Sequence, residues 1–176
     1  MHMPKYNRDI HHRRSIRLQH YDYAQTGVYF ITLCTLNREC LFGKILAGEM
    51  HLNKLGTIVR DEWLQTPCLR PNIRLGEWVV MPNHFHGIVE INGQSKSRRG
   101  VLHTPSSDVY PIIKSPSQTL GAMVRGFKSA VTRRANIPVW QRNYWEHIIR
   151  NQDSHHDIAT YITNNPAQWE TDSLHR

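Results

Sequence analysis

The predicted order of strands and helices places this chain in the α+β class, as a ferredoxin-like βαββαβ antiparallel sheet with an appended C-terminal helix. Four short apolar segments have the composition of strands, and segments with a helical apolar stripe follow the first and the third of them. A further helical segment follows the fourth. The 176 residues suffice for one core and are few for two, so we expect a single domain, residues 1–176.

The four predicted strands are rich in β-branched and aromatic residues. They cover residues 28–35, 73–81, 84–91 and 142–149. Pro82 and Asn83 are expected to form the turn of a hairpin between the second and the third strand. The first and third strands of such a sheet are usually central, which places residues 84–91 in the middle of the sheet. One face of the sheet should stay free of the two core helices.

The three predicted helices are marked by their ends. They cover residues 54–64, 116–134 and 153–165. Asn53 is the expected N-cap of the first helix. Ser115 as N-cap, Pro116 at the first helical position and Gln118 three residues after the cap predict the start of the second. Pro166 ends the last.

Composition and charge indicate a polyanionic partner. The formal net charge is +8 and the pI is near 9.7, which is typical of proteins that bind nucleic acid. Residues 1–26 form a predicted basic arm, and the polar segment 93–114 is expected to be a flexible loop. No apolar run reaches transmembrane length, and the basic arm lacks the apolar core of a signal peptide. We therefore expect a cytoplasmic protein without a membrane partner.

The segment around His84 and His86 carries the strongest chemical signal. Residues two apart on a strand point to the same face, so the two imidazoles project together while Phe85 points into the core. Two imidazoles on one rigid face make half of a metal site. The alternative is two polar residues on the solvent face of an edge strand, but the flanking run is too apolar for that.

Tyr161 and Asn165 lie four apart on the last predicted helix and therefore share a face. If that helix crosses the sheet, the phenol and the amide oxygen could both reach the two histidines. Two imidazoles and an amide oxygen leave open positions on a divalent ion that can polarise a phosphodiester. Tyr161 could then attack the phosphate. Taken alone, Tyr161 is better explained by ordinary packing with Ile158 and Ile162, and Asn165 by a position before proline that needs no function.

Four segments in order resemble the HUH single-tyrosine transposases, and most closely the REP-associated tyrosine transposases. They are GVYFIT (27–32), WVVMPNHFHGI (78–88), WQRNYWEHIIRN (140–151) and YITNNP (161–166). The resemblance implies His84, His86 and Asn165 as ligands of Mg²⁺ or Mn²⁺, with Tyr161 as the nucleophile. It also implies an enzyme that cleaves and rejoins single-stranded DNA beside hairpins through a 5′-phosphotyrosine. Tyr144 is a second-choice nucleophile.

Basic side chains are the candidate DNA contacts, although charged runs are more often simply solvated. They are Arg125, Lys128, Arg133 and Arg134 on the second predicted helix, and Arg13 and Arg14 in the arm. The partner is then single-stranded or hairpin DNA, bound by a monomer or a homodimer.

Three other functions stay open. A histidine-triad nucleotide hydrolase would need a third histidine at position 88, which is Ile88. A non-catalytic hairpin-binding protein derived from a transposase would not need an intact set of His84, His86 and Tyr161. A metal-dependent phosphodiester hydrolase would use water and form no covalent adduct.

Overall fold

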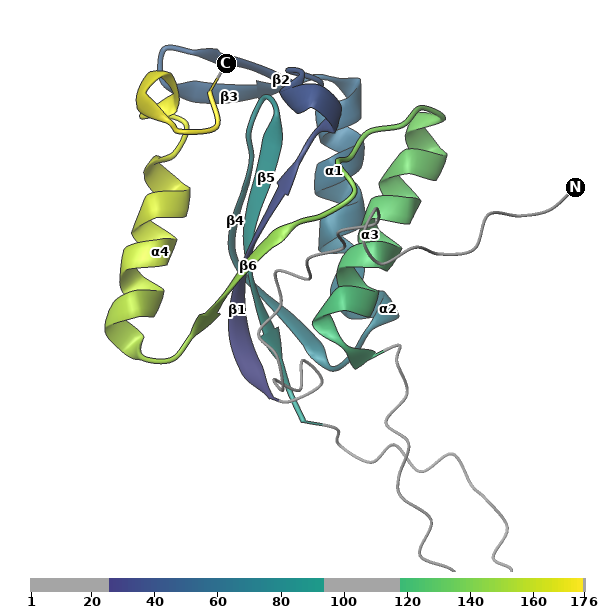
Figure 1. Ribbon diagram of the computed structural model, residues 1–176, viewed down its shortest axis with the longest axis vertical. Helices are drawn as coiled ribbons and strands as arrows, with labels where there is room; N and C mark the ends of the chain where they lie inside the picture. The colour runs from purple at the N-terminus through teal and green to yellow at the C-terminus, as the bar shows by residue number, and fades with distance from the viewer. Residues whose placement is uncertain (1–25, 94–117, 176) are drawn as a thin grey trace, which may run out of the picture.

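A four-stranded antiparallel sheet forms the centre of the computed structural model, which describes residues 26–93 and 118–175 (Figure 1). The strands are β1 (Gly27–Cys34), β4 (Ile73–Val80), β5 (His84–Ile91) and β6 (Trp145–Ile149), in the order β4-β5-β1-β6. Helices α1 (Lys54–Leu64) and α3 (Leu120–Ala135) lie together on one side, and α4 (Gln152–Asn164) lies on the other. The predicted α+β, ferredoxin-like class is confirmed, with β1 and β5 in the middle.

Strand register determines which side chains meet on the face toward α4. Thr32 of β1 lies opposite His86 of β5, and Cys34 lies opposite His84. On its other edge β1 pairs with β6, where Thr32 lies opposite Trp145. Both histidines therefore occupy a central strand, as predicted.

The other face of β5 belongs to the main apolar core. Phe85 is fully buried and its ring lies 4.6 Å from that of Trp63 on α1. Gly87 follows two residues later on the same face, and a Cβ there would lie 2.8 Å from the Trp63 ring. The glycine thus lets the indole pack directly against the strand. This layer supplies a rigid platform for the opposite face.

Several short elements were not predicted. They are η1 (Leu36–Arg38), β2 (Gly43–Leu46), β3 (Glu49–Leu52), α2 (Thr66–Leu69) and η3 (Trp169–Thr171). None is longer than four residues, which is too short for periodicity to be recognised. The β2-β3 hairpin and η3 lie beside each other near the C-terminal end of α4 (Figure 1).

Two predicted boundaries were wrong. The second long helix begins at Leu120 and is capped by Thr119, whose hydroxyl accepts from the Ala122 N–H at 3.1 Å. The last strand begins at Trp145 rather than at residue 142, because the ammonium of Lys128 binds the backbone carbonyl groups of residues 141–143 and holds them as a loop.

Some expectations fall outside the described residues. These are Arg13, Arg14 and almost all of the arm, most of the segment 93–114, and the caps Ser115 and Pro116. Among the helices of the described ranges, none is long and apolar enough to cross a membrane.

Candidate active site

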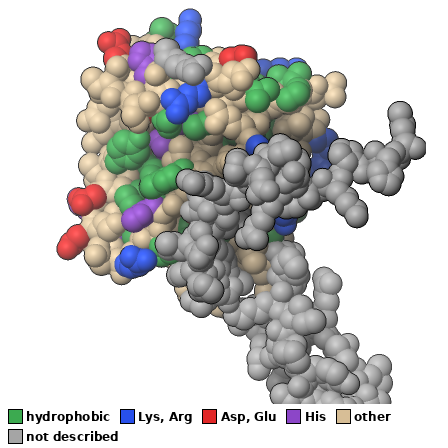
Figure 2. Space-filling model, viewed as in Figure 1, with side chains coloured by type: hydrophobic (Ala, Val, Ile, Leu, Met, Phe, Trp, Pro, Cys, Tyr) green, Lys and Arg blue, Asp and Glu red, His purple; other side chains and the backbone are tan. Residues whose placement is uncertain are grey.

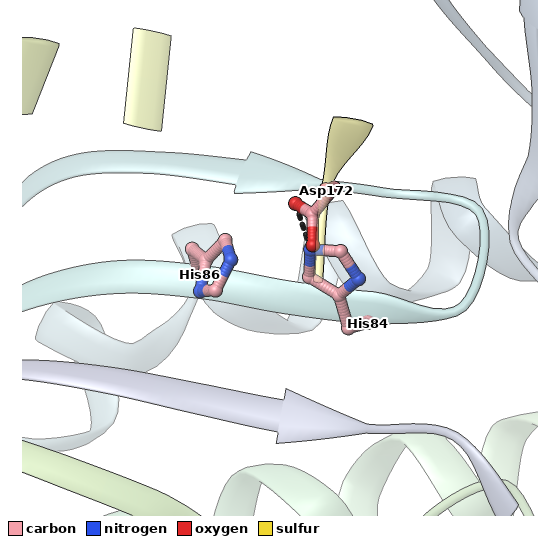
Figure 3. A group of neighbouring side chains, drawn as sticks. All are labelled: His84, His86 and Asp172. Carbon is pink, nitrogen blue, oxygen red and sulfur yellow. Dashed lines mark ion pairs between the residues drawn. The ribbon is translucent and has the colours of Figure 1, made fainter. Parts of the chain in front are cut away.

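The two histidines of β5 lie side by side beneath the C-terminal turn of the chain (Figure 3). His84 is 0% and His86 is 2% exposed, and their ring centroids are 4.5 Å apart. Polar rings this deeply buried need partners. Those partners define the chemistry of the site.

Asn83 fixes the tautomer of His84. The amide nitrogen of Asn83 donates to the carbonyl oxygens of Arg38 at 3.3 Å and Leu174 at 2.8 Å, so its Oδ1 must face the ring. This oxygen lies 2.8 Å from Nδ1 of His84. Because an amide oxygen only accepts, Nδ1 carries the proton. The lone pair of Nε2 is therefore available to an ion.

Asp172 is a member of the cluster that the sequence did not reveal. It follows η3, and its Oδ2 lies 3.8 Å from Nε2 of His84. Single ligand atoms of His84, His86 and Asp172 all lie within 4.8 Å of one another, which is close enough to surround one metal ion. A lone acidic residue near a chain end gives no periodic signal. Only the turn after α4 brings its carboxylate over the sheet.

Asn165 completes the group from the C-terminal end of α4. Its Nδ2 donates to Oδ2 of Asp172 at 2.9 Å, so its Oδ1 points away from that carboxylate. This oxygen and Nε2 of His84 are both buried, and neither has a hydrogen-bond partner among the described residues. An unsatisfied buried acceptor costs roughly 1–3 kcal/mol. Two such acceptors in one cluster fit a bound cation.

Tyr161 is held against the second histidine. Its hydroxyl lies 3.2 Å from Nε2 of His86, while Nδ1 of that ring lies 2.8 Å from Oγ1 of Thr32. The phenol ring packs edge-on against Phe30 at 6.2 Å. Tyr161 is 39% exposed, so its side chain is partly open to solvent. The last helix does cross the sheet, and it brings Tyr161 to the histidines.

The site keeps its imidazoles neutral and its phenol protonated. Burial lowers the pKa of His84 to about 4, against an opposing effect of the Asp172 carboxylate. Burial, and secondarily His84, lowers the pKa of His86 well below its ordinary value. Burial and Asp172 raise the pKa of Tyr161. Neutral imidazoles are the form that binds metal, whereas the phenol needs activation.

The candidate DNA contacts on α3 lie away from this cluster, except that the ammonium of Lys128 reaches the loop 141–143, part of which lines the cavity beside Tyr161. The helix is on the opposite side of the sheet from α4 (Figure 1). Arg125 and Arg133 are exposed, whereas Arg134 forms ion pairs with Glu62 at 2.9 Å and Asp61 at 3.8 Å. Lys128 is half-buried on backbone carbonyl groups, as described above. Tyr144, the second-choice nucleophile, lines a cavity next to Tyr161.

Comparisons with known proteins agree with this architecture. The structure of the REP-associated tyrosine transposase bound to a REP hairpin aligns with 89% of this chain and 74% of its own, at a TM-score of 0.59 and 22% identity. The chain therefore has the fold of that transposase, and the resemblance seen in the sequence is confirmed at the level of the fold.

No family model matches the sequence. A protein of Haemophilus influenzae, described as uncharacterized, is 49% identical over 176 residues that cover 97% of each chain. The chain belongs to one family with this Haemophilus protein.

Proposed function

We propose that this protein is an HUH-type tyrosine transposase that cleaves and rejoins single-stranded DNA beside hairpins. One observation supports this most strongly: Nε2 of His84 and Oδ1 of Asn165, two buried acceptors with no partner in the described part of the chain, lie in the same cluster as a tyrosine hydroxyl bound to His86. The transposase fold and the net charge of +8 agree with a DNA substrate. A cytoplasmic location and a monomeric or homodimeric state are part of the proposal.

A divalent ion, Mg²⁺ or Mn²⁺, would be held by His84, His86 and Asn165. Asp172 would add a carboxylate, either directly or by orienting the Asn165 amide through their 2.9 Å hydrogen bond. Nitrogen and oxygen donors of this kind suit a catalytic ion with open coordination positions. When bound, the ion would supply Lewis acidity toward a phosphodiester oxygen.

The protein's own groups then carry the transfer. Tyr161 gives up its proton to water, and the phenol oxygen forms a bond to phosphorus while the bond from phosphorus to the 3′ oxygen breaks. The 3′ oxygen takes a proton and leaves as a free hydroxyl, and the 5′ phosphate stays on the tyrosine. In the free protein the phenol is hydrogen-bonded to Nε2 of His86, so this hydrogen bond must break before the oxygen can attack the phosphate. The reverse reaction rejoins the strands without ATP, because the phosphotyrosine conserves the bond energy.

A doubly end-labelled DNA hairpin tests the nucleophile. With Mg²⁺ or Mn²⁺, the wild-type protein should carry only the label 3′ of the cut into a covalent protein–DNA band on a denaturing gel. Tyr161→Phe removes one oxygen and should give no band while DNA binding remains. Tyr144→Phe is the matched control and should form the adduct normally.

Other outcomes point elsewhere. An adduct that survives in Tyr161→Phe but vanishes in Tyr144→Phe would transfer the nucleophilic role to Tyr144. Cutting without any adduct would favour a hydrolase, for which the Asp172 carboxylate beside the histidines is the available base for water.

A further inference from the structure

A cavity of about 470 Å³ opens directly beside Tyr161. His86 and Tyr161 form one wall, and residues of β1, η1, the loop before β6 and the C-terminal turn form the others. The volume lies within the usual range for pockets that bury a small ligand or a fragment of a larger one. The ion and nucleophile proposed above leave this space unexplained.

The cavity has an aromatic interior. The Phe30 ring forms its floor, with the ring of Trp145 edge-on at 5.6 Å and that of Tyr161 edge-on at 6.2 Å. Trp145 is 51% exposed on the edge strand β6, although Trp is a residue that proteins normally bury well. Figure 2 shows hydrophobic and histidine side chains together on the surface between α4 and β6. The Trp145 ring also lies parallel to that of His147, with centroids 6.0 Å apart, and its exposed half remains available to a stacked ring.

Polar and cationic groups surround that interior. Arg38 lines the cavity and brings a guanidinium to it. Arg38 and the preceding Asn37 both have left-handed backbone, with φ of 56° and 55°. Such conformations in residues other than glycine cost energy and cluster at functional sites. Gln141 and Asn143 also line the cavity; Lys128 binds their backbone carbonyl groups, and no hydrogen bond engages either side chain among the described residues.

We infer that this cavity binds an unpaired nucleobase of the DNA strand next to the scissile phosphate, with the base against Trp145 and a neighbouring phosphate near Arg38. Aromatic stacking combined with a guanidinium is the usual way to hold single-stranded DNA. The amides of Gln141 and Asn143 can discriminate between bases. The inference rests on the proposed function, because it takes the phosphate at Tyr161 to be that of DNA.

Fluorescence tests the base pocket independently of catalysis. A DNA hairpin with single-stranded flanks carries 2-aminopurine at one flank position at a time, and Tyr161→Phe serves as the background that binds without cutting. Stacking on Trp145 should quench the probe at one position. Adding Trp145→Ala should abolish the quenching, and Trp145→Phe should retain it. Leu64→Ala, an exposed apolar residue on α1, is the control and should retain it fully.

Cleavage by the otherwise wild-type protein gives the second arm. Trp145→Ala should slow adduct formation about 5- to 150-fold, the range expected from the loss of one stacked base. An abasic nucleotide at the quenched position should slow adduct formation by the wild type to a similar extent. It should not slow adduct formation by Trp145→Ala any further. If the rate losses from the abasic nucleotide and from Trp145→Ala multiply, or if quenching persists in Trp145→Ala, the base does not bind in this cavity. A covalent adduct formed by the wild type would still support the transposase activity in that case. Absence of an adduct in the wild type would instead overturn the proposed function.

Discussion

The two faces of the sheet are built from the same strands and have opposite characters. Toward α1 and α3, β5 presents Phe85 and Val89, which are buried in a large apolar core. Toward α4 the same strand presents His84 and His86, and the apolar cluster on that side is small. Its buried members are Phe30, Ile88, Ile149 and Ile162.

Adjacent residues of β5 therefore serve different purposes: Phe85 stabilises the fold, whereas its neighbours His84 and His86 belong to the candidate active site. Because side chains of a strand alternate, Phe85 can hold β5 in place while its two neighbours remain polar and buried. The α4 face keeps acceptors that have no partner within residues 26–93 and 118–175, which costs stability, and the α1/α3 face supplies the apolar burial that offsets the cost. Changes on the two faces should therefore affect different measurements.

The largest effect is expected for the ligand set. His84→Asn keeps a donor for the Asn83 oxygen but removes Nε2, so cleavage should fall more than about 100-fold, beyond the loss typical for outer partners of a metal site. The fold should survive with a change of less than about 1 kcal/mol in unfolding free energy. The wild-type melting temperature should rise with added Mn²⁺ and that of the variant should not. Near-normal cleavage by the variant would remove His84 from the ligand set.

On the opposite face, Phe85→Ala should destabilise the protein by about 3–5 kcal/mol. It removes a fully buried ring that contacts Trp63 at 4.6 Å and Phe127 at 5.6 Å between centroids. Denaturant unfolding of Phe85→Ala and His84→Asn in parallel would test whether stability depends mainly on the face toward α1 and α3. A larger loss for the histidine variant would contradict it.

The alternation that creates the two faces is visible in the sequence, and so the fold was predicted well. Asn53 caps α1 as expected, and its side chain accepts from the Gly56 N–H at 3.0 Å. The start of α3 was wrong because Thr119 forms the cap, whereas the sequence offered an equally good signal at Ser115. Local signals of similar strength compete, and tertiary packing decides between them.

For the site, local spacing was sufficient to place residues of one element. His84 with His86, and Tyr161 with Asn165, lie together as predicted, although their roles remain predictions. Partners from other elements could not be found this way. Thr32 meets His86 only through the β1-β5 register, across 54 residues of chain, and Asp172 arrives through a turn without periodicity.

Acid should destabilise the α4 face selectively. The pKa of His84 is lowered to about 4 by burial, from about 6.5 in the unfolded chain, and that of His86 is lowered as well. The unfolded state therefore binds more protons between these values, and stability should be complete above pH ~6.5 and fall as the pH drops toward 4. Protonation of His84 should account for a loss of unfolding free energy on the order of 3 kcal/mol at most.

Denaturant unfolding at a series of pH values, with a chelator present, measures this loss. His84→Asn is the matched variant and should show a flatter dependence over the same range. Equal slopes in both proteins would assign the acid sensitivity to other groups.

The smallest effect concerns the far side of the sheet, where the α3 cations contact DNA only if the substrate extends around a sheet edge. Arg125 is exposed and has no ion-pair partner among the described residues. If it binds a phosphate, Arg125→Ala should lower the slope of log affinity against log salt by about one. Arg134→Ala is the matched control, since Glu62 and Asp61 already hold that guanidinium, and its slope should change less. Unchanged slopes in both would confine the DNA to the α4 face, and the two faces would then differ in binding as completely as they do in chemistry.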